Sequence, residues 1–168
     1  MDQVFDVLNA YRSLAQQMVS FALAAAIWRW GGGPERWMIG IFITTMVLPV
    51  YVIWALGLQA VENGPYAPLV FLVDAIAAAL YIAIALHANR NYPLWVAGFQ
   101  VVSVVAHMAK VMVDSVSPLA FAVLVIGPSY GQLLAIAGGF IRHVLRERRF
   151  GLYREWRLTP PGLRWLRL

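Results

Sequence analysis

Long apolar stretches separated by short polar connectors dominate the chain. Each stretch is close to the roughly 20 residues that an α-helix needs to cross the hydrocarbon core of a bilayer. The connectors GGGPER, AVENGP, NRNY and SVS contain the Gly, Pro, Asn and Ser residues that are typical of turns. Because connectors this short join antiparallel neighbours, we expect an all-α, up-and-down bundle. The pattern predicts five transmembrane helices, at residues 11–30, 37–59, 66–88, 93–114 and 118–141.

The composition agrees with a chain that lies largely in lipid. Of the 168 residues, 61% are hydrophobic and only 12% are charged, and the mean hydropathy is +0.69. A typical soluble domain carries about 25% charged residues. We therefore predict a helical bundle at residues 1–141 and a basic tail at residues 142–168. The absence of cysteine excludes disulfides, thiolate nucleophiles and cysteine-ligated metal sites from this chain.

The arginines predict the orientation of the helices. Arg29 and Arg36 flank the first connector, Arg90 lies in the third, and eight more arginines follow the last apolar stretch. All of them fall on one side of a five-helix bundle, and the positive-inside rule assigns that side to the cytoplasm. We therefore predict an external N-terminus, a cytoplasmic tail and a location in the plasma membrane, of the bacterial inner-membrane type.

The tail predicts contact with anionic lipid, since each basic residue near a membrane surface contributes about 1 kcal/mol to such binding. The alternatives are docking to an acidic partner or RNA, and a tail that only anchors the topology, which needs no partner and is the interpretation that we favour. We expect no nucleic acid as a partner, because the basic residues gather in a tail and not over the fold. The candidate lipid- or partner-binding residues are Arg142, Arg146, Arg148, Arg149, Arg154 and Arg157.

The first predicted helix has a second interpretation, as a cleaved signal peptide. Residues 22–26 read Ala-Leu-Ala-Ala-Ala, which resembles a small-residue cleavage region. However, Asp2 and Asp6 make the preceding segment acidic, and Arg29 follows the apolar stretch closely. A signal peptide has a basic segment in front of its apolar one, so we favour a retained helix.

A polar stripe runs along the fourth predicted helix. Its members recur at spacings of three and four residues, which places them on one face. Asp74, in the third helix, lies at the same predicted depth as His107 of that stripe, about 10 Å from the outer end by the helical rise. A buried carboxylate costs several kcal/mol unless it is paired, so we predict that Asp74 pairs with His107 or Lys110. The stripe consists of Gln100, Ser103, His107, Lys110 and Asp114.

These residues predict an intramembrane polar site that opens to the outside. Tyr130 of the fifth helix belongs to it, and the other polar residues expected around it are Gln16, Gln17, Thr44, Thr45, Ser129 and Gln132. Intramembrane ionisable residues are commonly functional, which favours a proton-titratable or ligand-binding site. The alternative is a structural pair whose hydrogen bonds fix the register of the helices.

Other chemistry has weaker support. His87 and His143 both lie near the inner boundary, where a bis-histidine haem site is one alternative and interfacial histidines are the simpler one. The sequence contains no HExxH or GxSxG motif, identifies no cofactor and shows no metal-ligand cluster. The small-xxx-small spacing of Gly127 and Gly131 favours close helix packing over a hinge. Gly31–Glu35 predicts a tight turn and not a phosphate loop, since it lacks the Lys-Ser/Thr ending.

The sequence leaves three functional hypotheses. The first is a small non-enzymatic polytopic membrane protein that is an accessory or oligomeric subunit, assembled with itself or in a larger complex, with a polar intramembrane site. The second is a small proton-coupled transporter or channel that uses Asp74 and His107. The third is a membrane cofactor carrier or enzyme.

Overall fold

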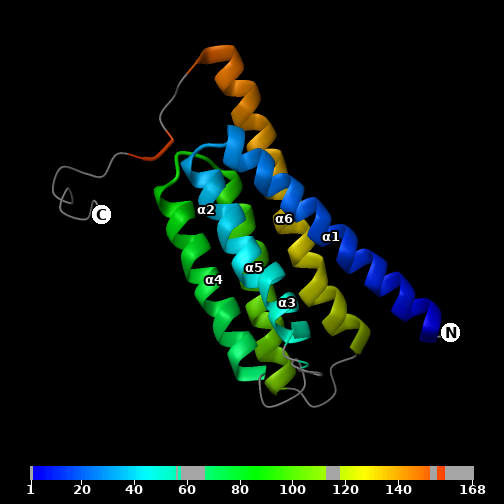
Figure 1. Ribbon diagram of the computed structural model, residues 1–168. Coiled ribbons are helices and arrows are strands. Elements are labelled where there is room, and N and C mark those ends of the chain that lie inside the picture. Colours follow the sequence, from blue (N-terminus) through cyan, green and yellow to red (C-terminus); the bar gives the residue numbers. More distant parts are fainter. Residues whose placement is uncertain (1, 56, 58–66, 113–117, 152–154, 158–168) are drawn as a thin grey trace.

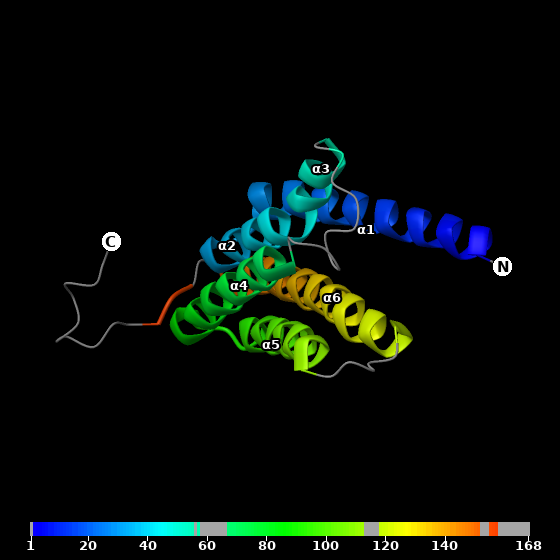
Figure 2. The same cartoon turned by 90° about the horizontal axis from the view of Figure 1, so that it is seen from below.

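The computed structural model describes residues 2–55, 57, 67–112, 118–151 and 155–157, and every regular element in this part of the chain is helical. The helices form a bundle from which the N-terminal half of α1 projects (Figure 1; Figure 2). An all-α architecture is therefore confirmed. In chain order the elements are α1 (Asp2–Trp30), α2 (Gly33–Phe42), the π-helical η1 (Ile43–Val47), α3 (Leu48–Ala55), α4 (Ala67–His87), α5 (Tyr92–Met112) and α6 (Pro118–Phe150).

Within the described residues, three helical stretches are long enough and apolar enough to cross a membrane, namely Gly33–Ile53, Pro68–His87 and Tyr92–Ala109. Their outward faces support a membrane location. On α4, for example, Leu69, Leu72 and Ile76 recur at helical spacing and are about half exposed. Contiguous apolar faces of this kind are unfavourable in water and suit lipid or a protein partner. The spans predicted within α1 and α6 remain predictions.

The second predicted helix is continuous but irregular. It begins at Gly33, earlier than predicted, because Gly32 forms the N-cap and Pro34 occupies the first turn, where proline is well tolerated. At η1 the backbone N–H of Leu48 donates to the Ile43 carbonyl, five residues back. Pro49 has no N–H to give to the Thr45 carbonyl, so its ring accounts for the local widening of the helix.

Helix α5 packs against α4 on one side and against α6 on the other, while α1 and α2 pair and also contact α6. Small residues allow the close approach of α5 and α6. A Cβ added to Gly131 would lie 2.7 Å from the Phe99 ring, and one added to Gly139 would lie 2.6 Å from the Tyr92 ring. The predicted close packing is thus confirmed at Gly131, whereas Gly127 has open space around it.

We call one end of the bundle the basic end; there α1 passes into α2, residues 87–92 join α4 to α5, and α6 runs on to Phe150. Near this end Ile27, Met38 and Phe42 of the apolar core are wholly buried. Gly151, with a φ of +75°, ends α6 in the left-handed conformation that favours glycine. Residues 155–157 then return to residues 87–89 through two backbone hydrogen bonds, from the Asn89 N–H and from the Arg157 N–H.

Candidate functional site

Asp74 and His107 form a pair between α4 and α5. His107 Nδ1 lies 3.2 Å from Asp74 Oδ2, and Gln100 Nε2 donates to Asp74 Oδ1 over 3.1 Å. Asp74 is only 6% exposed. Of the two partners predicted for Asp74, His107 and Lys110, the described residues show the contact with His107. It arises because Gln100 and His107 are two helical turns apart on one face of α5, so that both reach the same carboxylate.

The protonation of His107 follows from its neighbours. Its Nδ1 faces two acceptors, the Asp74 carboxylate and the Ser103 carbonyl, the latter at 3.0 Å. When Asp74 is ionised, two acceptors surround this nitrogen, and they favour the tautomer that carries its hydrogen on Nδ1.

The hydrogen-bond network continues onto α6 through Gln132, which is 1% exposed. Gln132 Nε2 donates to Gln100 Oε1 over 2.6 Å, which links three helices through one chain of polar groups. The Gln132 Oε1 atom has no hydrogen-bond partner within the described residues. A buried amide oxygen without a donor is costly, so this atom favours a bound water or ligand.

A cavity of about 190 Å³ adjoins the network. It has room for several water molecules or a small polar ligand. Two of its walls come from irregular stretches of helix, around η1 and around Pro128. The polar residues that line it are Thr45, Asp74, Gln100, Ser103, His107, Ser129 and Gln132, and the apolar ones are Met46, Pro49, Val50, Ile53, Val70 and Pro128.

Helix α1 joins the polar region at its edge. Gln16 Nε2 donates to Ser129 Oγ over 3.1 Å, and Tyr51 Oη donates to Gln17 Oε1 over 2.8 Å. Of the other predicted residues, Tyr130 is half-buried and does not line the cavity. Lys110 lies on α5, but its side chain is outside the described part of the chain, as is the whole of Asp114.

A second polar cluster occupies the basic end, and the sequence analysis missed it. Glu35, from the first turn of α2, forms an ion pair with Arg90, from the connector between α4 and α5. The two side chains are 0% and 8% exposed. Both residues look like ordinary connector residues in the sequence, and only the folding of α2 against α4 brings them together.

The returning tail adds a third charge to this cluster. Glu155 Oε2 accepts a hydrogen bond of 2.7 Å from the Gly33 N–H, and its Oε1 lies 3.8 Å from Arg90 Nη2. A Cβ on Gly32 would collide with this carboxylate, so the glycine at this position provides the space that the Glu155 side chain occupies. The predicted tight turn is confined to Gly31 and Gly32, since residues 33–35 form the first turn of α2, and the Glu155 carboxylate binds at this junction.

His143 of α6 completes the cluster. Arg90 Nη2 lies 3.2 Å from His143 Nδ1, and His143 Nε2 lies 3.6 Å from Glu147 Oε2. Burial, with the nearby Arg90 charge, lowers the pKa of His143, so its ring is neutral at pH 7. A neutral ring accepts the Arg90 hydrogen at Nδ1 and keeps its own on Nε2.

The two histidines that were considered for a haem site have other contacts. His143 contacts Arg90, and His87 Nδ1 lies 2.7 Å from the Ala83 carbonyl oxygen.

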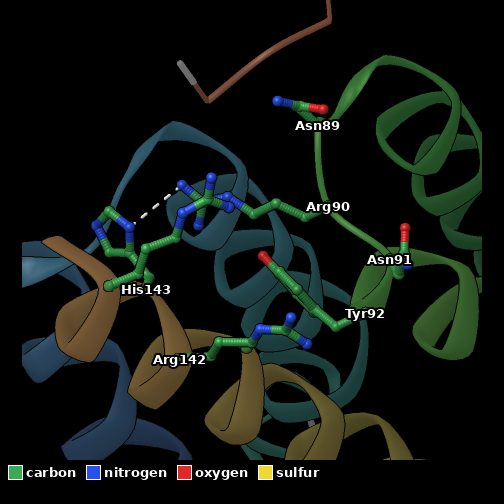
Figure 3. A pocket seen from close by; sticks show the side chains of 8 residues that line it. Asn89, Arg90, Asn91, Tyr92, Arg142 and His143 are labelled. Carbon is green, nitrogen blue, oxygen red and sulfur yellow. Dashed lines mark hydrogen bonds between the residues drawn. The ribbon is translucent and has the colours of Figure 1, made fainter. Parts of the chain in front are cut away.

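Two of the cavities that open at this end adjoin the cluster. The first, of about 190 Å³, is lined by Asn89, Arg90, Asn91, Tyr92, Gly139, Arg142, His143 and Arg146 (Figure 3). The second, of about 440 Å³, contains Arg29, Arg36, Arg148 and Glu155 in its lining. Of the remaining predicted tail residues, Arg149 has its guanidinium carbon 5.4 Å from the centre of the Phe150 ring. The Arg157 N–H donates to the His87 carbonyl, and Arg154 is outside the described residues.

Comparisons with protein-family models, with curated proteins and with solved structures find no match for this chain. The two polar clusters and their cavities are therefore the basis on which a function can be proposed.

Proposed function

We propose that the protein is an integral membrane protein with five transmembrane helices, its basic end in the cytoplasm and its N-terminus outside. The gathering of Arg29, Arg36, Arg90 and the arginines of α6 at one end supports this orientation through the positive-inside rule. The membrane that we propose is the plasma membrane, of the bacterial inner-membrane type.

We further propose that the polar cavity is a proton-linked binding site and that the protein is a small, non-enzymatic transporter or channel. The observation that carries this proposal is the pairing of Asp74 with His107 beside a cavity. Loss of one proton from the pair changes its net charge from zero to minus one. In a low-dielectric site such a charge requires compensation, by a returning proton or by another cation. The site thus couples proton release to uptake of a positively charged solute.

The irregular helices around the cavity support a conformational change of the protein during transport. The π-turn of η1 precedes Pro49, and Pro128 lies inside α6. Such interruptions weaken the local hydrogen-bond ladder and commonly mark functional bends. Because both interruptions line the same cavity, a change in either helix would alter access to Asp74.

The test is proton flux in proteoliposomes that contain the purified protein and a pH-sensitive dye. We expect flux in response to a cation gradient, and we expect Asp74→Asn to abolish it while the protein stays folded. Glu147→Gln is the matched control, since it neutralises a carboxylate of α6 outside the cavity. Native flux in Asp74→Asn would refute the proposal. If Asp74→Asn instead lowers thermal stability and the native protein carries no flux, the pair is structural.

Membership in a larger assembly is a second candidate, and α1 favours it. In both views α1 leaves the bundle toward its N-terminus (Figure 1; Figure 2). Its large side chains Tyr11, Leu14 and Met18 are more than half exposed. A second copy or a partner subunit would cover this surface, as lipid would. Light scattering of the protein in mild detergent decides between them, since a monomeric mass would exclude a stable assembly.

A further inference from the structure

The direction of the hydrogen bonds in the Asp74 network leaves one buried acceptor beside the cavity. Gln100 Nε2 lies 3.1 Å from Asp74 Oδ1 and 3.3 Å from the backbone carbonyl oxygen of Asp74. A backbone carbonyl can only accept, so this end of the Gln100 amide is the nitrogen whether or not Asp74 is protonated. Gln100 Oε1 then accepts from Gln132 Nε2, and Gln132 Oε1 is the end of the chain that finds no donor among the described residues.

Two hydroxyl groups that line the cavity are also acceptors. Thr45 Oγ1 donates over 2.8 Å to the carbonyl four residues before it, and Ser129 Oγ donates over 2.7 Å to the carbonyl three residues before it. A hydroxyl group has one hydrogen, so each of these oxygens has only lone pairs left for a ligand. Together with Gln132 Oε1 and the Asp74 carboxylate they make the cavity rich in acceptors, which suits a ligand group that donates several hydrogen bonds.

The charge of the site favours a cation as that donor. Asp74 is 6% exposed, and none of the described residues that line the cavity is Lys or Arg. When the pair of Asp74 and His107 has released its proton, its net charge is minus one. An ammonium group carries one positive charge, three N–H donors and no acceptor, so it matches both the charge and the hydrogen-bonding capacity of the cavity.

The remaining wall of the cavity requires an apolar body on the ligand. That wall consists of Met46, Val50, Ile53, Val70 and two prolines. Val70 lies one helical turn before Asp74 on the same face of α4, so the apolar wall borders the carboxylate. An apolar protein cavity of about 150 Å³ holds benzene, so a cavity of about 190 Å³ has room for a short hydrocarbon chain, whereas a metal ion would fill only a small part of it.

The lining also distinguishes between classes of ammonium ion. Quaternary ammonium ions are typically bound over the faces of aromatic rings. None of the described lining residues is Phe, Tyr or Trp. A quaternary ion also has no N–H, so it would leave Gln132 Oε1 without a donor. The cavity therefore favours a primary ammonium ion.

We propose that the cavity binds short primary alkylammonium ions. The ammonium group donates to Asp74 and to Gln132 Oε1, directly or through an ordered water, and the alkyl chain lies against Val50 and Val70. This assignment rests on the proposed function, because it names the class of positively charged solute that exchanges for the proton of the pair.

Calorimetric titration of the full chain in mild detergent at pH 7 tests the assignment with three probes of equal size. They are n-butylammonium, its isomer tetramethylammonium, which has no N–H, and 1-butanol, which has no charge. Alkylammonium groups are charged at this pH, as that of lysine is. We expect n-butylammonium to bind at least about tenfold more tightly than either of the others. From methylammonium to n-butylammonium, binding should tighten by about fourfold for each methylene group, since each one buries apolar surface.

A matched pair of variants locates the site. Thr45→Val removes a lining acceptor without a change of shape and should weaken n-butylammonium binding by about fivefold or more. Thr44→Val is the control, because Thr44 makes a similar backbone hydrogen bond in η1 but does not line the cavity, and its binding should be unchanged. Gln132→Leu should weaken binding at least about tenfold. Thermal unfolding without ligand verifies that each variant is folded, and the threonine pair decides the matter if Gln132→Leu is not.

Every other result overturns the assignment. Equal binding of tetramethylammonium would show that N–H donors are not recognised, and equal binding of 1-butanol would show a merely apolar cavity. Sodium binding without n-butylammonium binding would assign a metal ion, and binding of no probe would assign water. Binding of n-butylammonium only in Lys110→Met would show that the ammonium group of the chain itself occupies the site.

Proteoliposomes separate this assignment from the transport proposal. Binding of n-butylammonium in detergent without proton flux in an n-butylammonium gradient would refute transport and leave the ligand class standing. Proton flux driven by a sodium gradient, without n-butylammonium binding, would refute the ligand class and leave proton-linked transport standing.

Discussion

Removal of the Arg90 side chain, as in Arg90→Met, should be the most damaging single change at the basic end. It leaves the Glu35 carboxylate wholly buried without its counter-charge. Breaking a buried pair from one side costs about 3–5 kcal/mol, because the remaining charge keeps its desolvation penalty. The loss of the contacts with His143 and Glu155 adds to this cost. For a chain of this length each kcal/mol lowers the melting temperature by about 2–4 °C, so we expect a decrease of at least about 6 °C.

A double-mutant cycle in detergent measures this pair directly. Glu35→Gln, Arg90→Met and the combination are compared with the native protein by thermal unfolding followed by circular dichroism. The double variant should recover much of the loss of Arg90→Met, since neither charge then remains buried alone. If Arg90→Met costs less than about 1 kcal/mol, or if the two single losses simply add, Glu35 and Arg90 are not coupled and the reasoning is wrong.

Two further predictions concern the same half of the molecule. Burial and the Arg90 charge lower the pKa of His143 below its ordinary 6.5, so at this residue the unfolded chain binds more protons than the folded protein. The free energy of unfolding should therefore fall as the pH drops through and below about 6.5. Unfolding measured from about pH 8 to about pH 5 should show this fall, and His143→Gln should flatten the profile. Gly139→Ala should destabilise the protein by about 1–3 kcal/mol, since the new methyl meets the Tyr92 ring. Gly138→Ala, with open space around it, should be neutral in the same unfolding assay, and equal losses in the two variants would contradict the packing argument.

The pairing of Asp74 with His107 could be predicted because it depends on only two regularities. The helical period places Gln100, Ser103 and His107 on one face, and a short connector makes α4 and α5 antiparallel neighbours. Together these determine the relative depth of residues on the two helices. The requirement that a buried carboxylate be paired then limits its partner to His107 or Lys110, and the structure shows the contact with His107. The apolar stretches likewise predicted an all-α chain, since their length and hydropathy need no knowledge of packing.

The tertiary structure alone decided the rest. Rotation of each helix about its axis is set by side-chain packing, and it leaves Tyr130, which was predicted to belong to the polar site, outside the cavity. The pair of Glu35 with Arg90 joins two connectors, and connectors have no period from which a contact can be inferred. The docking of Glu155 depends on the space above Gly32, which exists only once α2 has packed beside the α4–α5 connector. Local sequence determines which segments are helical and which faces are polar, whereas contacts between distant segments depend on how the whole chain packs.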